Sequence, residues 1–188
     1  MIAESETFGG TWPYKANYCT TAGFRQHYVD EGSKNGEVII CLHGEPTWGY
    51  IYRRFIKSLS KTYRVVVPDH MGFGKSETPQ DKDYTLQTHV ENITSLIDYL
   101  KLKDITFVGQ DWGGPIAGAY TLRNPSLVKR LCLMNTVLGY SGEKAKKTPW
   151  FDWVSKHEEA GTLPGILGEL GSTVLSIMKI LGFQNNAV

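Results

Sequence analysis

The sequence predicts an α/β fold, in which a mostly parallel β-sheet is flanked by helices on both faces. Three observations lead to this prediction. Short apolar runs of strand length recur through residues 1–135, segments with helical spacing of apolar residues separate them, and glycine-rich turns follow several of the runs. Strands that alternate with helices are typical of a parallel sheet covered on both faces.

The expected strands are an antiparallel edge strand at residues 24–30 and four buried strands at residues 38–42, 63–68, 105–108 and 131–134. The expected helices lie between them, at residues 50–59, 86–100 and 115–122. Thr85 precedes the second helix and is expected to cap it, since a threonine hydroxyl can accept a hydrogen bond from a free backbone N–H at a helix start. Cys41 and Cys132 fall within apolar strands, so both are interpreted as small core residues.

The pattern changes after Asn135. Residues 136–147 are rich in glycine and lysine, and residues 150–159 could form a helix that Thr148 caps and Pro149 begins. Residues 163–183 predict a second helical region, and no further strand alternates with these helices. We therefore interpret residues 1–135 as part of a core domain and residues 136–188 as the start of a helical insertion over the sheet.

Composition excludes several classes of function. The 188 residues carry 20 Lys and Arg against 19 Asp and Glu, and no basic run predicts a nucleic-acid partner. The first ten residues lack the apolar centre of a signal peptide, and the apolar stretch at 170–183 is too short to span a bilayer. The three cysteines show no metal-ligand spacing. The sequence therefore predicts a cytoplasmic protein with no membrane partner and no bound metal.

The most informative stretch is Gly109-Gln110-Asp111-Trp112-Gly113-Gly114, which lies between an expected strand and an expected helix. This is the context of a nucleophile elbow, in which the central residue sits on a sharp turn and small residues flank it at a distance of two. Asp111 holds the central position here. The alternative is a glycine-rich turn in which Asp111 only caps the helix.

An aspartate at this position predicts a particular chemistry. An unperturbed Asp side chain has a pKa of about 3.9, so the carboxylate is ionised at neutral pH and needs no base before it attacks. The positive end of the following helix favours the ionised form further. The natural first step is displacement at an sp³ carbon, which gives an alkyl ester of the enzyme. Trp112 carries one indole N–H, a donor that suits a leaving halide, although the ring could also serve only in packing.

Three motifs occur in order: His43-Gly44-Glu45-Pro46-Thr47-Trp48, Asp69-His70-Met71-Gly72-Phe73-Gly74-Lys75-Ser76, and the stretch around Asp111. Together they resemble the haloalkane dehalogenases of the α/β-hydrolase superfamily, over residues 24–135. The resemblance implies that Asp111 is the nucleophile, that Trp112 binds the halide, and that the backbone N–H groups of Glu45 and Trp112 form an oxyanion hole. It also implies a helical cap, a halogenated alkane and water as substrates, a halide ion as product, and no cofactor.

The sequence departs from that family in ways that bear on turnover. Glu45 stands where many members have an Asn that donates to the halide, and an ionised Glu cannot donate. The candidates for a second donor are then Trp150 and Trp153. Asn135 occupies a position at which one branch of the family has its acid, so the acid and the catalytic His are both expected beyond Val188, with the last two strands. None of the five histidines follows such a strand, and His43 and His70 are interpreted as structural.

Two alternatives to the dehalogenase remain open at this point. An epoxide hydrolase shares the Asp-Trp turn but uses two cap tyrosines, of which residues 136–188 offer only Tyr140. The chain as given could instead be an inactive truncated fragment. A serine esterase is disfavoured because Asp111 replaces the serine, and a phosphate-binding loop at residues 72–76 is excluded because Asp69 stands where its leading glycine belongs.

Overall fold

The structure is a computed structural model, and it describes residues 2–136, 155–157 and 159–162. The chain divides into two compact units, residues 1–139 and 140–188. In the second unit, residues 155–157 and residue 159 are helical. The predicted helix at 150–159 therefore lies mostly outside the described residues, and the helical region predicted at 163–183 lies wholly outside them.

The first unit is built on a six-stranded sheet in the order β1-β2-β4-β3-β5-β6. The strands are β1 (Asn17–Cys19), β2 (Gln26–Glu31), β3 (Val38–Leu42), β4 (Arg64–Pro68), β5 (Ile105–Gln110) and β6 (Val128–Met134). β3 pairs in parallel with β4 and β5, and β5 pairs in parallel with β6, whereas β1 and β2 are antiparallel to their neighbours. The prediction of a mostly parallel sheet is confirmed.

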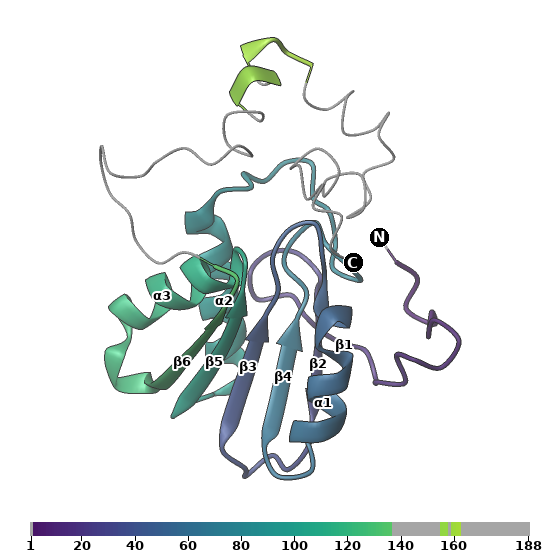
Figure 1. Cartoon of the computed structure of the whole chain (residues 1–188), viewed down its shortest axis with the longest axis vertical. Helices are drawn as coiled ribbons and strands as arrows, with labels where there is room; N and C mark the ends of the chain where they lie inside the picture. The colour runs from purple at the N-terminus through teal and green to yellow at the C-terminus, as the bar shows by residue number, and fades with distance from the viewer. Residues whose placement is uncertain (1, 137–154, 158, 163–188) are drawn as a thin grey trace, which may run out of the picture. The chain divides into compact units, whose positions relative to one another are not determined.

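Helices cover both faces of the sheet (Figure 1). On one face, α2 (Leu86–Leu100) and α3 (Gly113–Arg123) pack on a core that includes Ile40 and Phe107. On the other face, η1 (Gly49–Tyr52) and α1 (Arg53–Leu59) pack on the residues of β3 and β4 that point the opposite way. A short turn, η2 (Pro125–Leu127), leads into β6. Successive strand residues point to opposite faces, so the fully apolar runs fill both cores.

Thr85 caps α2 as predicted, because its hydroxyl accepts a hydrogen bond of 3.2 Å from the backbone N–H of Thr88. β2 forms the antiparallel strand that was expected at residues 24–30, but the expected position at the edge of the sheet was wrong. β1, which the sequence analysis missed, pairs with the outer side of β2 and takes the edge position. With three residues, β1 is too short to show the alternation that identifies a strand in a sequence.

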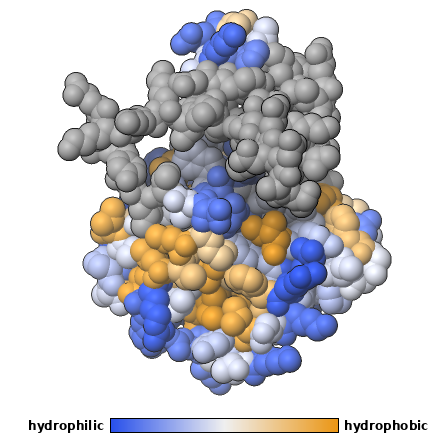
Figure 2. Space-filling model, viewed as in Figure 1, coloured by the Kyte–Doolittle hydropathy of each residue, from blue (hydrophilic) through white to orange (hydrophobic). Residues whose placement is uncertain are grey.

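The prediction that residues 131–134 form a buried strand was right about the strand and wrong about the burial. β6 is the last strand of the described sheet, and Leu131, Cys132 and Leu133 are all exposed. Cys132 is therefore exposed in the described structure, against the expectation of a core residue, whereas Cys41 on the central strand β3 is fully buried. Figure 2 shows apolar residues gathered over the side of the sheet where β5 and β6 lie.

The loop after β4 is fixed by a buried aspartate and tied to the start of the chain. Asp69 accepts hydrogen bonds from the backbone N–H groups of Gly49 and Lys75 and from Nδ1 of His27, each at 2.8 Å. The ammonium group of Lys75, a residue only 2% exposed, donates to the backbone carbonyls of Glu4 and Glu6 at 2.7 and 2.8 Å. The loop thus holds the N-terminal segment against the core.

Candidate active site

Asp111 occupies the turn between β5 and α3, where the sequence placed it. Its φ of 52° lies in the left-handed region, which costs a residue other than glycine on the order of 1–3 kcal/mol and is commonest at functional sites. The turn is held by the end of β6 and the residues after it, since the Asp111 backbone N–H donates to the Asn135 carbonyl at 3.2 Å and the Asp111 carbonyl accepts from the Thr136 hydroxyl at 2.6 Å.

Close packing explains the glycines on either side of this turn. A Cβ atom on Gly109 would lie 2.8 Å from the carbonyl oxygen of Gly113, and one on Gly113 would lie 2.0 Å from that of Leu42. Both distances are shorter than a Cβ atom tolerates, so the turn needs glycine at each place. The glycine spacing that suggested an elbow therefore has a steric cause in the structure.

The side chain of Asp111 does not cap the helix. Its Oδ1 atom accepts a hydrogen bond of 2.9 Å from the backbone N–H of Glu45, and α3 begins without a side-chain cap. The Glu45 backbone N–H therefore contacts the carboxylate of Asp111. No hydrogen bond joins the Trp112 backbone N–H to this carboxylate among the described residues, and the oxyanion hole of Glu45 and Trp112 stays a prediction.

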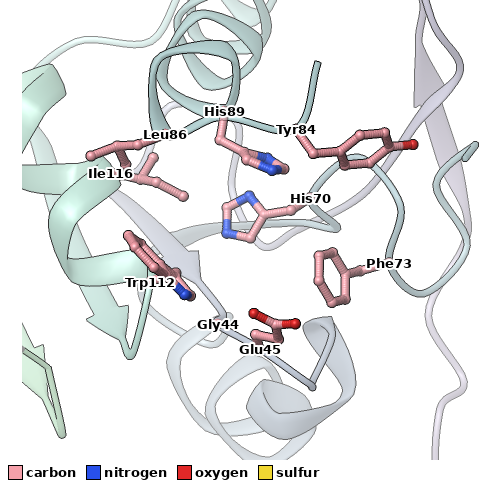
Figure 3. Close-up of a pocket in the computed structure, with 9 residues that line it drawn as sticks. All are labelled: Gly44, Glu45, His70, Phe73, Tyr84, Leu86, His89, Trp112 and Ile116. Atoms are coloured by element: carbon pink, nitrogen blue, oxygen red, sulfur yellow. The ribbon is translucent and has the colours of Figure 1, made fainter. Parts of the chain in front are cut away.

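A cavity of about 310 Å³ opens beside the turn. Its lining residues come from the loops after β3, β4 and β5 and from the starts of α2 and α3 (Figure 3): Gly44, Glu45, His70, Phe73, Tyr84, Leu86, His89, Trp112 and Ile116. Ligands of parallel sheets bind in this position, outside the carboxyl ends of the strands. Asp111 is not a lining residue itself, but Glu45, which donates to its carboxylate, and Trp112, which follows it, both are.

Glu45 and Trp112 lie at the same end of the cavity in Figure 3. The Trp112 side chain is 44% exposed, which is unusual for a tryptophan that serves only in packing. Glu45 is an exposed residue, but its carboxyl group is partly shielded from water. This desolvation raises the pKa of Glu45, and the charge of Asp111 raises it further. Protonation of Glu45 would give this end of the cavity a second hydrogen-bond donor.

The histidines differ in how their ring nitrogens are used. His43 is fully buried, its Nδ1–H donates to the Gly44 carbonyl at 2.9 Å, and its Nε2 accepts from the His70 backbone N–H at 2.9 Å. Both nitrogens are engaged, which agrees with the structural role expected for His43. His70 also lines the cavity, and its Nδ1 atom has no partner among the described residues. The structural role predicted for His70 therefore does not account for its place in the wall of the cavity.

Some predicted site residues cannot be placed. Trp150, Trp153 and Tyr140 lie outside the described residues. Within the described ranges, no group of three or more His, Cys, Asp or Glu side chains could hold a metal ion. In the same ranges, no helix has both the length and the apolar character that crossing a bilayer requires.

Several residues of the cavity were not expected from the sequence, chiefly Tyr84, Leu86 and His89. Leu86 and His89 are three positions apart near the start of α2, so they share one side of that helix. The apolar spacing of the helix assigned Leu86 to the core and drew no attention to His89. A histidine one turn after a helix start, beside an exposed leucine, was the available signal.

A strained aspartate at a strand-to-helix turn, above a mostly parallel sheet covered by helices, has the backbone arrangement of a nucleophile elbow. The family described as alpha/beta hydrolase fold matches residues 37–160, more than half of the chain. The chain belongs to this family.

Similarity to individual relatives is more specific than the match to the family. The chain is 36% identical over 154 residues to a cis-3-alkyl-4-alkyloxetan-2-one decarboxylase of Shewanella oneidensis, covering 80% of this chain and 48% of that protein. It is 43% identical over 116 residues to a haloalkane dehalogenase of Psychrobacter cryohalolentis, covering 61% of this chain and 38% of that one. The chain thus spans about half or less of the length of these relatives.

The chain is also similar to a solved structure of a haloalkane dehalogenase. The haloalkane dehalogenase DpaA of Paraglaciecola agarilytica superimposes with a TM-score of 0.73 at 35% identity, covering 92% of this chain and 60% of that one. The resemblance to haloalkane dehalogenases, predicted from three motifs, is confirmed.

Proposed function

We propose that this chain carries the nucleophile of a haloalkane dehalogenase-like hydrolase, with Asp111 in that role. The observation that carries the proposal is the carboxylate of Asp111, held on a strained turn by a hydrogen bond from the Glu45 backbone N–H to Oδ1. The substrate is a halogenated alkane, bound in the cavity that Glu45 and Trp112 line. Its apolar lining, which includes Phe73, Leu86 and Ile116, suits an alkyl chain.

The proposal gives each oxygen of the carboxylate a role. Oδ1 is held by the Glu45 N–H, which leaves Oδ2 to attack the carbon that bears the halogen. The new C–O bond forms as the carbon–halogen bond breaks, and the halide leaves with the electron pair toward the indole N–H of Trp112. Oδ1 becomes the carbonyl oxygen of the ester, and the Glu45 N–H is already placed to stabilise the oxyanion that forms when water attacks.

Hydrolysis of the ester requires a water molecule and a general base, which typically contributes 10²–10⁴-fold. His43 cannot supply this base, because both of its ring nitrogens are engaged. The same proposal includes residues 136–188 as the start of a helical cap. It also places the acid and the histidine of the catalytic triad in the part of the relatives that this chain does not match. Because the proposed base belongs to that unmatched part, we expect the 188 residues to complete the first step only.

Incubation with excess 1-bromohexane tests the proposal. We expect at most about one bromide per chain, and peptide mapping should find the hexyl ester on Asp111. Asp111→Asn is the matched control, because it keeps the shape of the side chain and removes the negative charge. An adduct at another residue, or equal bromide release by Asp111→Asn, would refute Asp111 as the nucleophile. Sustained bromide release would show that the chain contains a working base.

A second candidate, decarboxylation of an oxetan-2-one, is favoured by Glu45. An ionised carboxylate disfavours a bound halide, whereas a protonated one could donate to an oxygen leaving group. Attack by Asp111 at the ring carbon bonded to oxygen would break that C–O bond and release a carboxylate. Loss of CO₂ would then expel Asp111 and leave an alkene, with no water or base consumed. Release of CO₂ over many turnovers from a cis-3,4-dialkyloxetan-2-one, without bromide release from 1-bromohexane, would decide for this candidate.

Epoxide hydrolysis, which the sequence left open, depends on cap tyrosines. Its one candidate in this chain, Tyr140, lies outside the described residues. Nothing in the described cavity favours it over the two candidates above, since the Tyr84 hydroxyl already donates to the Pro79 carbonyl at 2.8 Å. The dehalogenase proposal remains the first choice.

A further inference from the structure

Two imidazole rings meet inside the cavity, and hydrogen bonds fix the proton of one of them. Nε2 of His70 lies 2.8 Å from the backbone carbonyl oxygen of His43. A carbonyl oxygen can only accept, so His70 carries its proton on Nε2. In the neutral ring, Nδ1 then presents a lone pair and can only accept a hydrogen bond.

That lone pair is buried. His70 is 3% exposed, and its Nδ1 has no partner among the described residues. Buried polar atoms in folded proteins nearly always have a partner, so an unpartnered one in a cavity indicates a place for a ligand group. Figure 3 shows the His70 ring in the middle of the cavity, with a ring nitrogen on the side of His89.

His89 presents the complementary feature. Its Nδ1 is also buried and has no partner among the described residues. The centroids of the two rings are 5.6 Å apart and the planes are inclined by 75°. Rings at this separation and inclination touch edge to face, so a single group placed beside both rings can contact the two of them at once. No hydrogen bond fixes the proton of His89 among the described residues, so its Nδ1 is able to donate.

Both rings favour the neutral form. Burial lowers the pKa of His70 well below its ordinary value, and the neighbouring His43 and His89 lower it further. Burial also lowers the pKa of His89, with His43 as the second cause. The other titratable groups that line the cavity are the Glu45 carboxyl group and Tyr84, whose hydroxyl is already bound to Pro79. The subsite therefore offers one acceptor and one donor and no positive charge.

We propose that Nδ1 of His70 and Nδ1 of His89 bind a hydroxyl group of the substrate, remote from the carbon that Asp111 attacks. A hydroxyl group donates to His70 and accepts from His89 through a single atom. A methylene group does neither, a carboxylate cannot donate, and an ammonium group cannot accept. Together with the proposed function, on which this step rests, the subsite identifies the substrates as alkyl compounds that carry an alcohol.

Binding can be measured without any reaction, by using diols and 1-alkanols of equal length. The pairs are 1,4-butanediol and 1-butanol, 1,6-hexanediol and 1-hexanol, and 1,8-octanediol and 1-octanol. Each titration is followed by Trp fluorescence and by the imidazole ¹⁵N chemical shifts. For at least one length we expect the diol to bind about tenfold more tightly, as one or two net hydrogen bonds predict, with a shift change at Nδ1 of His70. Equal affinities at every length would overturn the proposal.

Three variants locate the effect. His70→Gln keeps a donor for the His43 carbonyl and removes the acceptor Nδ1, so the preference for the diol should disappear. His89→Leu should reduce it by removing the donor, and His89→Asn should restore part of it, because its amide can donate from a similar position. If His70→Gln does not fold, the His89 pair still decides. A preference that survives in His89→Leu and in every folded variant of His70 would overturn the assignment.

Turnover separates this proposal from the proposed function. Bromide release is compared for 6-bromo-1-hexanol and 1-bromohexane, and we expect the bromoalcohol to react at about tenfold lower concentration. Failure of both compounds to alkylate Asp111, with the diol preference intact, would refute the nucleophile and leave the hydroxyl subsite standing. Alkylation of Asp111 by both compounds at equal concentrations, with no diol preference, would support the nucleophile and refute the hydroxyl subsite.

Discussion

Gly44→Ala should disable Asp111, the proposed nucleophile, while leaving the sheet intact. A Cβ atom on Gly44 would lie 2.2 Å from Oδ1, 2.3 Å from Cβ and 2.7 Å from Cγ of Asp111. Non-bonded heavy atoms are most stable at about 3.5–4.0 Å, so the closest pair must separate by roughly 1.3 Å. Asp111 is held on its turn by the end of β6 and the residues after it, so the strain must displace its carboxylate, the Gly44 loop, or both.

The loss of rate follows from that displacement. Misplacing a reacting group by about 1 Å can cost on the order of 10²-fold. Moving the loop would also shift the Glu45 N–H away from Oδ1, which weakens the hydrogen bond that orients the carboxylate. We therefore expect alkylation of Asp111 by 1-bromohexane to slow by about 10²-fold.

Mass spectrometry of the adduct against time measures this rate, and near-ultraviolet circular dichroism reports the fold. Gly36→Ala is the matched control. Gly36 precedes the opposite end of β3, and a Cβ atom there would press on the backbone of Arg64 and Ser33 at 3.1 Å without touching Asp111. Alkylation of a folded Gly44→Ala variant at the rate of the parent chain would refute the placement of the nucleophile.

Three further predictions test separate parts of the structure. Trp112→Phe keeps the ring and removes the indole N–H, so alkylation should slow by about 10²–10³-fold; an unchanged rate would assign Trp112 to packing. Thr85→Ala should lower the free energy of unfolding in urea by about 1 kcal/mol by removing the cap of α2, and Thr94→Ala, further along that helix, is its control. Lowering the pH from about 7.5 to about 5.5 should reduce stability, because the unfolded chain takes up a proton at His70 near pH ~6.5 while burial keeps the folded one neutral. His70→Gln should flatten that profile, and an identical profile in the variant would contradict this cause.

The sequence predicted the parts of the fold that depend on local pattern. Apolar runs with turn residues at each end identified β3, β4 and β5, and the apolar spacing together with Thr85 gave both ends of α2. Pairing partners depend on the whole sheet, which is why β2 was assigned to the edge. The exposure of β6 has the same origin, since a run of apolar residues shows that a strand forms but not what lies beside it.

The candidate site shows a similar division. Asp111 and Glu45 were found because motif spacing fixes the turns on which they sit, and backbone geometry follows from turns. The His70 and His89 pair could not be found in this way. Its character depends on which ring nitrogen has a partner, and that is decided by the His43 carbonyl, 27 positions away along the chain. A sequence pattern places a residue on a helix, strand or turn, but it does not show which ring nitrogen of a histidine carries the proton.

The bond between Lys75 and the start of the chain has a practical consequence for anyone who produces this protein. An expression vector that trims residues 2–6 would remove the carbonyls of Glu4 and Glu6, which are the two acceptors of the Lys75 ammonium group in the structure. The damage would not remain at the terminus. Lys75 also donates through its backbone to Asp69, and the next residue along from Asp69 is His70 in the wall of the cavity. A tag is therefore better attached ahead of an intact N-terminus than in place of it.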